Sequence, residues 1–501
     1  MRITFVHLGR ENLGIEYLSA VAKQAGHQVC LAMDPGLFGL NDNVFYIPFL
    51  EKKIDQRELV LKKIEKSDPD VVAFSVYTGT YKWAVDLARE IKKKMDIKTI
   101  FGGIHVTLVP EFAIQEGSID FLIVGEGEEA FLELLEALES GKSPEKIRNL
   151  WLRKDGNIIQ NPLRPVITNL DTLPLPDKEL FEEDINYKDD YLVMTSRGCP
   201  YSCSYCCESY YNKLYSRKFF RRRGVDSVIN ELVIMKKRYH FREVMFNDSI
   251  FFTDLRWLRE LLERYKTHVG VPFRCFGRVN AFNEEVAELL KGAGCYAIEF
   301  GIQTLNESLR KRILHRPERN QDSMKAFTIC DTYGIRYDID HMFGLPEERE
   351  EDHIYAAQVY GRLKYLNRIK CHNLSYFPNL PITLSAQAKG LLSYPDVQRI
   401  IAGEDEKDFF HSDSVKERGW QQTNKGYQIL YKFLPLLRPA QISFLLTHNL
   451  QKKLHYLPQP VVIFLQMLVA IRGKDYRFLL YVKYYYWRIK RWLGLRLKLE
   501  T

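Results

Sequence analysis

The chain has 501 residues, of which 46% are hydrophobic and 27% are charged, values typical of a soluble protein with a sizeable core. Its nine cysteines are an odd number, and the opening stretch MRITFVHLGREN reads as a strand, without the apolar segment of a secretory signal. These features disfavour a secreted disulfide scaffold and indicate reduced thiols or metal ligands in a cytoplasmic protein. The net charge of +8 is uneven, because residues 431–501 carry 13 Lys and Arg but only 2 Asp and Glu.

Apolar strands alternate with amphipathic helical segments through residues 1–142. Near-continuous apolar strands separated by helices predict a parallel sheet covered on both faces, which is a doubly wound, Rossmann-like α/β domain. Ligands of such sheets bind beyond the carboxyl ends of the strands, and three of these ends are SVYTGT at 75–80, GGIHVT at 102–107 and GEGEEAF at 125–131. Because glycine lets the backbone approach a large ligand closely, we interpret this region as a binding domain.

Residues 143–190 are expected to form a linker. LWLRKDGNIIQNP predicts a hairpin around Asp155 and Gly156, and LDTLPLPD holds too much proline for a helix or a central strand. Between residues 191 and 395, six strand candidates alternate with helical patterns. This alternation predicts a partial (β/α)6 parallel barrel, short of the usual eight units, with its active site at the carboxyl ends of the strands.

The segment SRGCPYSCSYCCES directly follows the first barrel strand and places Cys199, Cys203 and Cys206 in one tight loop. Three thiolates can hold one face of a cubane iron–sulfur cluster and leave one iron open, whereas a structural cluster normally has four thiolates. An open position is what a catalytic metal site requires. The alternative is a zinc half-site of Cys203 and Cys206, which needs a second ligand pair that the sequence does not offer. We interpret the other cysteines as packed thiols: Cys30, Cys207, Cys275, Cys295, Cys330 and Cys371.

The Cys-x3-Cys-x2-Cys spacing, Tyr205 before the third cysteine and the preceding strand ending in TSRG together resemble the radical S-adenosylmethionine (SAM) superfamily. Residues 2–142, with ENLGIEYLSAVAKQAGHQV, GGIHVT and DFLIVGEGEEAF, resemble the cobalamin (B12)-binding domain that precedes many of these enzymes. LDTLPLPD is similar to their connector, and FNDSIFF, IEFGIQT and FGLPEE are similar to their barrel-strand motifs. The resemblance covers about residues 1–395.

This resemblance implies three cofactors: a [4Fe-4S] cluster on Cys199, Cys203 and Cys206, SAM on the open iron, and cobalamin. It places contacts to SAM on Tyr205, Asp248, Arg278, Glu299 and Gln303, although family members often have Glu at the last position. Charge balance between strands is the alternative role for these side chains. For cobalamin it implies residues at the ends of the first domain's strands, namely Gly14, Ser75, Thr78, Gly102, Gly103, His105, Gly125, Glu126 and Gly127.

The lower ligand of the cobalt is a separate question. HLGRENLG at 7–14 stands where classical cobalamin proteins have an Asp-x-His-x-x-Gly loop, so the resemblance implies a corrinoid without a histidine from that loop. His105 is the tempting substitute. Because loop histidines more often pack on a ligand or cap a helix, we expect His105 to line the corrinoid pocket without binding cobalt.

The implied chemistry is reductive cleavage of SAM to a 5′-deoxyadenosyl radical, which abstracts hydrogen from an unactivated carbon. Cobalamin could then supply a methyl group, so the first prediction is methylation of a small-molecule or lipid-like substrate, with an external one-electron reductant as partner. One alternative uses the same cofactors for cyclisation, oxidation or carbon–carbon bond formation without methyl transfer. Another is a non-catalytic cobalamin sensor or carrier.

Residues 396–501 are expected to form a basic, aromatic-rich helical region. The apolar run 454–471 is interrupted and falls short of the about 20 apolar residues that a membrane span needs. Basic helices of this kind predict a position on anionic lipid at the inner face of the membrane, through residues 431–501. The alternative is a helical cap packed on the barrel. The basic run RKFFRRR at 217–223 is not followed by an RNA-binding module, so no nucleic-acid partner is expected.

Overall fold

The computed structural model describes all residues of the chain except 40–46, 55, 217–218, 405–417, 476 and 501. The expectation for the basic run 217–223 therefore lies partly outside the described residues. Two described arginines of this run, Arg221 and Arg223, are 9% and 5% exposed and form ion pairs with Glu126 and Glu231. They are internal structural charges rather than a solvated basic face.

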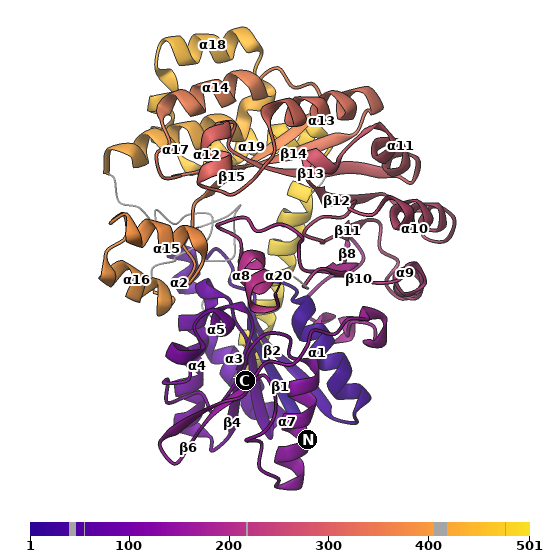
Figure 1. Cartoon of the computed structure of the whole chain (residues 1–501), viewed down its shortest axis with the longest axis vertical. Coiled ribbons are helices and arrows are strands. Elements are labelled where there is room, and N and C mark those ends of the chain that lie inside the picture. The colour runs from indigo at the N-terminus through magenta and orange to yellow at the C-terminus, as the bar shows by residue number, and fades with distance from the viewer. Residues whose placement is uncertain (40–46, 55, 217–218, 405–417, 476, 501) are drawn as a thin grey trace.

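The first domain is built on a seven-stranded sheet in the order β2-β1-β3-β4-β5-β6-β7 (Figure 1). Its first five strands are parallel, as predicted, and β6 and β7 are antiparallel. These last two strands are the hairpin that the sequence assigned to the linker. They pair with the edge of β5 and so cover an edge that would otherwise be open. The strands are β1 (Arg2–Leu8), β2 (Gln28–Asp34), β3 (Val71–Ser75), β4 (Lys98–Gly102), β5 (Phe121–Ile123), β6 (Leu150–Lys154) and β7 (Asn157–Gln160).

Helices cover both faces of this sheet, which explains why its central strands are apolar throughout. On one face, Ile3 and Phe5 of β1 belong to a core that includes residues of α1 (Leu13–Gln24) and α7 (Glu128–Ser140). On the other face, Val6 lies in a core with residues of α3 (Arg57–Ser67) and α4 (Thr78–Lys94). The helices α5 (Ile104–Leu108) and α6 (Pro110–Ala113) follow β4.

The second domain is a six-stranded parallel sheet in the order β15-β14-β13-β12-β11-β8, so each strand lies beside the previous one in the chain. This is the predicted partial barrel of six strand–helix units. The strands are β8 (Tyr191–Val193), β11 (Val244–Phe246), β12 (Phe273–Gly277), β13 (Cys295–Gln303), β14 (Arg336–Phe343) and β15 (Leu366–Asn373). The covering helices are α9 (Val225–Tyr239), α10 (Leu255–His268), α11 (Glu284–Gly292), α13 (Asn320–Tyr333) and α14 (Glu350–Tyr360).

The two faces of the barrel sheet differ in polarity. Along β13, Ile298, Phe300 and Ile302 pack in the core formed with the helices. Alternate residues of a strand point to opposite faces, so Glu299 and Gln303 face the inside of the barrel. On this inner face, Glu299 forms ion pairs with basic side chains of β12 and β15, whereas the opposite face of β13 is apolar.

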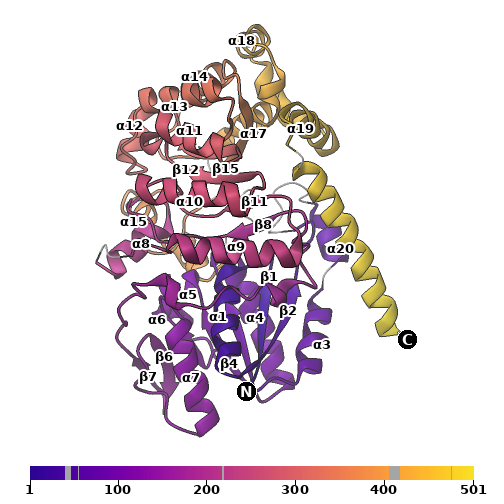
Figure 2. The ribbon, with the colours of Figure 1, turned by 90° about the vertical axis from the view of Figure 1, so that its right-hand side faces the viewer.

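The C-terminal region is helical and packs on both domains (Figure 2). It contains α15 (Pro381–Ala388), α16 (Tyr394–Ile401), α17 (Arg418–Phe433), α18 (Pro439–Thr447), α19 (Gln459–Gly473) and α20 (Arg477–Glu500). Helices α17 and α19 lie against β15 at the edge of the barrel. Helix α20 runs along the side of the molecule, from the barrel past the first domain. The contacts of α17 and α19 with β15 are those expected for a helical cap packed on the barrel, which was the alternative to a position on lipid.

In the described part of the chain, no single helix has the length and apolar composition of a membrane span. One pair of consecutive helices meets those criteria together, Leu450–Tyr456 with Gln459–Gly473, but the two are bent by 116° relative to each other.

Candidate active site

The cysteine loop is anchored at both ends by short regular elements. It leaves the two-residue strand β9 (Ser196–Arg197), which pairs with β10 (Arg221–Arg222), and enters α8 (Cys207–Leu214) with Cys206 as the N-cap residue. Within the loop, the Asn212 amide donates hydrogen bonds of 2.9 Å to the carbonyl oxygens of Cys199 and Tyr201. These bonds fold the loop so that its three thiols come from one compact turn.

The three thiols are largely withdrawn from solvent and interact with one another electrostatically. Cys199 and Cys203 are 8% and 7% exposed. Burial, with a smaller contribution from negative charge on Cys206 and Cys203, raises the pKa of the Cys199 thiol to about 12. Three thiolates in this loop therefore require positive charge beside them. Bound iron would supply it, and the Arg278 guanidinium already lies 3.6 Å from the Cys203 sulfur.

The donor set fits a cubane better than a single ion. Among the described residues, no three His, Cys, Asp or Glu side chains converge as around one metal ion. A cubane does not require such convergence, because each thiolate binds a different iron. The three cysteines of the loop combine sulfur donors from one short segment with a neighbouring cation, Arg278.

Two of the residues expected at SAM gather beside the cysteine loop. Arg278 stacks on the Tyr201 ring, 3.6 Å from its centroid, and donates to Glu318 through Nε at 2.6 Å. Tyr205 accepts a hydrogen bond of 3.0 Å from Arg316. Arg316 also pairs with Glu318 at 2.9 Å, so one carboxylate holds both arginines. No local sequence signal marks Arg316 or Glu318, because their role depends on contacts with distant segments of the chain.

Gln303 joins the same group at the end of β13. Its backbone has φ of +65°, a left-handed conformation that is uncommon for a residue with a side chain and is typical of functional sites. Arg316 donates a hydrogen bond of 2.6 Å to the carbonyl oxygen of Gly301, and a Cβ on that glycine would lie 2.8 Å from the Gln303 amide nitrogen. Gln303, Arg316 and the cysteine loop thus adjoin.

Asp248 and Glu299 have structural partners instead. Asp248 accepts three hydrogen bonds from Thr195 and Ser196 through one oxygen, at 2.5 to 3.0 Å, while its other oxygen has no hydrogen-bond partner. Glu299 is 4% exposed and pairs with Arg274 and Lys370. These contacts match the alternative to a SAM contact, in which the two side chains balance charge and form hydrogen bonds within the barrel.

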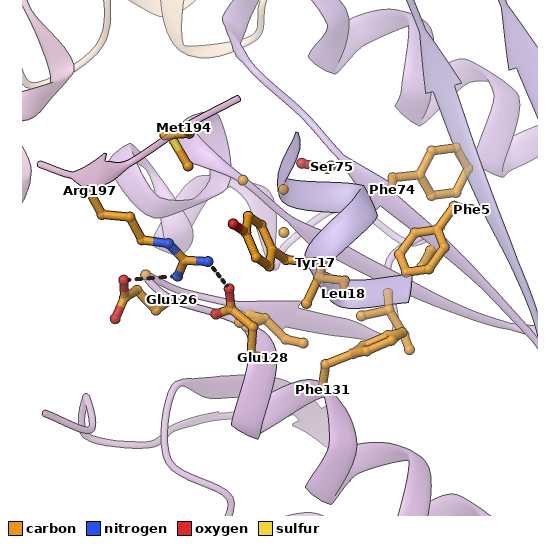
Figure 3. A pocket seen from close by; sticks show the side chains of 18 residues that line it. Phe5, Tyr17, Leu18, Phe74, Ser75, Glu126, Glu128, Phe131, Met194 and Arg197 are labelled. Atoms are coloured by element: carbon orange, nitrogen blue, oxygen red, sulfur yellow. Dashed lines mark hydrogen bonds and ion pairs between the residues drawn. The ribbon is translucent and has the colours of Figure 1, made fainter. Parts of the chain in front are cut away.

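A cavity of about 200 Å³ opens at the carboxyl ends of the first domain's strands (Figure 3). Its deep part is apolar and aromatic, with Phe5, Leu18, Phe74 and Phe131. Its rim is rich in glycine, and the rim includes seven residues expected to contact cobalamin: Gly14, Ser75, Gly102, Gly103, Gly125, Glu126 and Gly127.

Two rim glycines are required by the backbone. Gly103 has φ of +99°, and a Cβ there would lie 2.6 Å from the Val76 carbonyl oxygen. Gly125 has φ of +82°, and a Cβ there would lie 2.0 Å from the Tyr215 hydroxyl. The apolar part of the cavity fits a flat, bulky heterocycle. Its glycine-rich rim lets the backbone approach polar substituents of such a ligand. These are the properties of the nucleotide end of a corrinoid.

Comparison with protein families agrees with both halves of this site. The model of the B12 binding domain matches residues 8–135, and the model of the radical SAM superfamily matches residues 193–358. The chain belongs to the radical SAM enzymes that carry a B12-binding domain. The cofactors of this family are cobalamin, a [4Fe-4S] cluster and SAM.

Curated radical SAM relatives differ in the reaction that their names give. An uncharacterized methyltransferase of Pyrococcus horikoshii is 33% identical over 303 residues, covering 58% of this chain and 64% of that protein, slightly less than two thirds of its length. A cytidylyl-2-hydroxyethylphosphonate methyltransferase of Streptomyces wedmorensis is 23% identical, covering 69% and 73%. An anaerobic magnesium-protoporphyrin IX monomethyl ester cyclase of Rubrivivax gelatinosus is 24% identical, covering 70% and 64%.

Among solved structures, the cobalamin-dependent SAM radical enzyme OxsB, with aqua-cobalamin and SAM bound, superposes with a TM-score of 0.65. The alignment covers 98% of this chain and 83% of that one at 14% identity. At this identity the likeness concerns the fold, which is therefore that of a B12-dependent radical SAM enzyme, including the helical region at the C-terminus.

Thr78 and His105 lie outside the lining of the cavity in this radical SAM enzyme. Nδ1 of His105 is 3.1 Å from the Thr78 hydroxyl, and Nε2 is 3.1 Å from the carbonyl oxygen of Ile401 in α16. Burial lowers the pKa of His105 to about 3, so the ring is neutral at ordinary pH. With both nitrogens engaged, His105 joins the first domain to the C-terminal region and does not line this cavity.

Proposed function

We propose that this radical SAM enzyme methylates an unactivated carbon of a small molecule, with the cluster on Cys199, Cys203 and Cys206 and a corrinoid in the glycine-rimmed cavity. The observation that carries the proposal is the adjacency of the two sites. Arg197 lines the cavity and precedes Cys199 by two residues. Two relatives named as methyltransferases support methyl transfer as the outcome.

When bound, the cluster supplies the electron that cleaves SAM, and the corrinoid supplies the methyl group. The chain's residues position these groups and exclude water. Arg278, beside the Cys203 sulfur and fixed by Glu318, offsets the negative charge of the thiolates and is the cation best placed for the SAM carboxylate. Tyr205, which is held by Arg316, and Gln303, whose amide nitrogen adjoins Gly301 as Arg316 does, are our candidates for its polar contacts. The orphan oxygen of Asp248 makes that residue a further candidate.

Product analysis tests the methylation. Anaerobically reconstituted protein with SAM, hydroxocobalamin and a one-electron reductant is incubated with candidate small molecules. Methylation is expected to yield S-adenosylhomocysteine and 5′-deoxyadenosine together, with a product heavier by one methylene. The relative named as a cyclase favours a second outcome, in which the same cofactors act without methyl transfer. That outcome would give 5′-deoxyadenosine without S-adenosylhomocysteine, and a non-catalytic carrier would give neither.

We also propose that α18 and α19 meet a membrane surface in the cytoplasm. On α19, Val461, Phe464 and Ile471 form an exposed stripe at helical spacing, while Val462 and Val469 on the other side are buried. Phe464 and Ile471 are 53% and 62% exposed. This apolar face lies in the strongly basic part of the chain, which complements anionic lipid.

Flotation with anionic liposomes tests the membrane proposal. Because α17, α19 and α20 pack on the rest of the molecule, point variants are preferable to a truncated chain. Phe464→Ser with Ile471→Ser is expected to leave the protein unbound, whereas wild type floats. Tyr394→Ser on α16, where the side chain is 68% exposed, is the matched control and is expected to float normally. Equal flotation of all three proteins would remove the proposal.

A further inference from the structure

The wall of the corrinoid cavity is completed by the barrel domain. Met194, directly after β8, and Arg197 of β9 line the cavity together with residues of the first domain (Figure 3). Arg197 reaches across the junction to two carboxylates, Glu126 at 3.2 Å and Glu128 at 2.6 Å. Its guanidinium carbon lies 5.1 Å from the centroid of the Tyr17 ring, another wall residue. The cavity therefore has its full lining only when the two domains are docked.

A second arginine of the barrel domain strengthens this junction. Arg221 faces Arg197 across the β9–β10 ribbon and donates hydrogen bonds of 2.9 and 2.8 Å to the two oxygens of Glu126. None of the four side chains is more than 13% exposed. Burial opposes the charge on Glu126, but the hydrogen bonds from Arg221 and the charge of Arg197 hold its pKa below the usual value. Glu126 thus keeps its charge between the two arginines, and the formal charges of the two arginines and two glutamates balance, so removing one member leaves a buried charge without compensation.

Only one residue separates this junction from the iron–sulfur loop. Gly198 joins Arg197 to Cys199, with φ of +84°, and a Cβ there would lie 2.6 Å from the carbonyl oxygen of Phe219. The segment therefore has one tightly packed backbone conformation. A displacement of Arg197 from its carboxylates would be transmitted to Cys199, the first of the three thiol ligands.

We infer that Arg197 is a positioning residue that couples the corrinoid cavity to the cysteine loop. This inference rests on the proposed function, since it concerns the same two cofactors. A corrinoid bound against Arg197 favours the docked position in which Arg197 holds both carboxylates, and that position fixes Cys199 for the cluster. Coupling of this kind is reciprocal, so protein that holds the cluster must bind the corrinoid more tightly than protein without it.

The coupling is measured by titrating hydroxocobalamin into the full-length protein under anaerobic conditions, with and without the reconstituted cluster. For wild type we expect the cluster to tighten corrinoid binding by about tenfold, within the usual range of such couplings. Glu128→Gln removes one of the two carboxylates that hold Arg197, and Arg197→Met removes the guanidinium. Both variants are expected to reduce the coupling to less than about twofold while their iron content stays that of wild type.

Glu129→Gln is the matched control. Glu129 is the next residue of α7, is 58% exposed and pairs with Arg164 rather than with the barrel domain, so its coupling should equal that of wild type. Failure of wild type to bind hydroxocobalamin at all would overturn the proposed function. Binding that is unaffected by the cluster, or full coupling in Glu128→Gln, would overturn only the inference. If Arg197→Met fails to fold, as a melting curve would show, Glu128→Gln decides alone.

Discussion

At the scale of single residues, the cavity proposed for the corrinoid depends on a position that only glycine fits. Gly125 is in a left-handed conformation, and the space beside it is occupied by the Tyr215 hydroxyl. That hydroxyl accepts a hydrogen bond of 3.1 Å from the backbone nitrogen of Glu126, so it cannot move without disturbing the rim. Strain and a direct clash would therefore act together on any larger residue.

Gly125→Ala is expected to abolish retention of hydroxocobalamin, because Tyr215 and the rim must shift to make room. The measurement is absorbance of the bound corrinoid after gel filtration. Gly117→Ala in the same domain serves as the control, since its Cβ would meet nothing within 4 Å and its backbone is not left-handed. Retention by Gly125→Ala equal to that of wild type would contradict the placement of the corrinoid.

His105 is one of the buried histidines that make the stability of the protein sensitive to acid. Its pKa is about 3 in the folded state, below the ordinary value of 6.5, so the unfolded chain binds a proton that the folded one excludes. Stability is therefore complete above the unfolded pKa and falls as the pH drops below 6.5. The loss between pH 7 and 5 amounts to about 2 kcal/mol from this group.

His105→Gln keeps the capacity for hydrogen bonds to Thr78 and Ile401 but does not titrate. Melting temperatures measured at pH 5, 6 and 7 are expected to decline less steeply for this variant than for wild type. Parallel declines would show that the His105 ring is not held neutral. Corrinoid binding at pH 7 should be nearly unchanged, because His105 does not line the cavity.

At the scale of elements, the inner face of the barrel is a set of buried charges carried by neighbouring strands. Glu299 on β13 pairs with Arg274 on β12 and Lys370 on β15, and Asp338 on β14 pairs with Arg368 at 3.0 Å. Removing one partner of a buried pair costs more than the pair contributes, because the remaining charge stays desolvated.

Glu299→Gln is expected to lower the free energy of unfolding by about 3 kcal/mol, since it leaves the buried Arg274 and the partly exposed Lys370 short of a partner. Urea unfolding monitored by circular dichroism measures the effect. In the control, Glu347→Gln breaks an exposed pair with Arg312, where both side chains are about half exposed, and should change it by less than about 1 kcal/mol. Similar losses in the two variants would contradict the buried charge network.

The elements themselves were largely predictable, whereas their long-range contacts were not. The apolar period along β13 and the glycines at the strand ends are local signals, so both parallel sheets and most of the cavity rim follow from the sequence. His105 was misleading because its partner Ile401 is 296 residues away. The hairpin at Asp155 was predicted, but nothing local showed that it would pair with β5. Arg197 stood beside the cysteines in the sequence, yet its two carboxylates come from the other domain.

At the scale of the whole molecule, α20 follows α19, which packs on the barrel, and α20 itself contacts the first domain and the linker. Arg488 of α20 pairs with Asp184 of the linker at 2.8 Å, and Tyr485 packs on Phe38 of the first domain with ring centroids 4.8 Å apart. Arg10 of the first domain donates a hydrogen bond of 3.0 Å to Tyr481. The basic, aromatic composition of this helix predicted a lipid contact, which stays a prediction. Two of its aromatic side chains, Tyr481 and Tyr485, pack on the first domain, whereas Tyr486 is 70% exposed. The exposed apolar stripe lies on α19.

The most direct test of the whole account uses anaerobically reconstituted protein. Its iron and sulfide contents are measured, and the electron paramagnetic resonance spectrum of the reduced protein is recorded with and without SAM. Wild type is expected to hold one [4Fe-4S] cluster whose spectrum changes when SAM binds the open iron. The triple variant with alanine for all three cysteines (Cys199→Ala, Cys203→Ala and Cys206→Ala) is expected to hold no cluster. It should still bind some hydroxocobalamin, which would show that the fold survives. An intact cluster in that triple variant, or none in wild type, would contradict the site described at the mouth of the barrel.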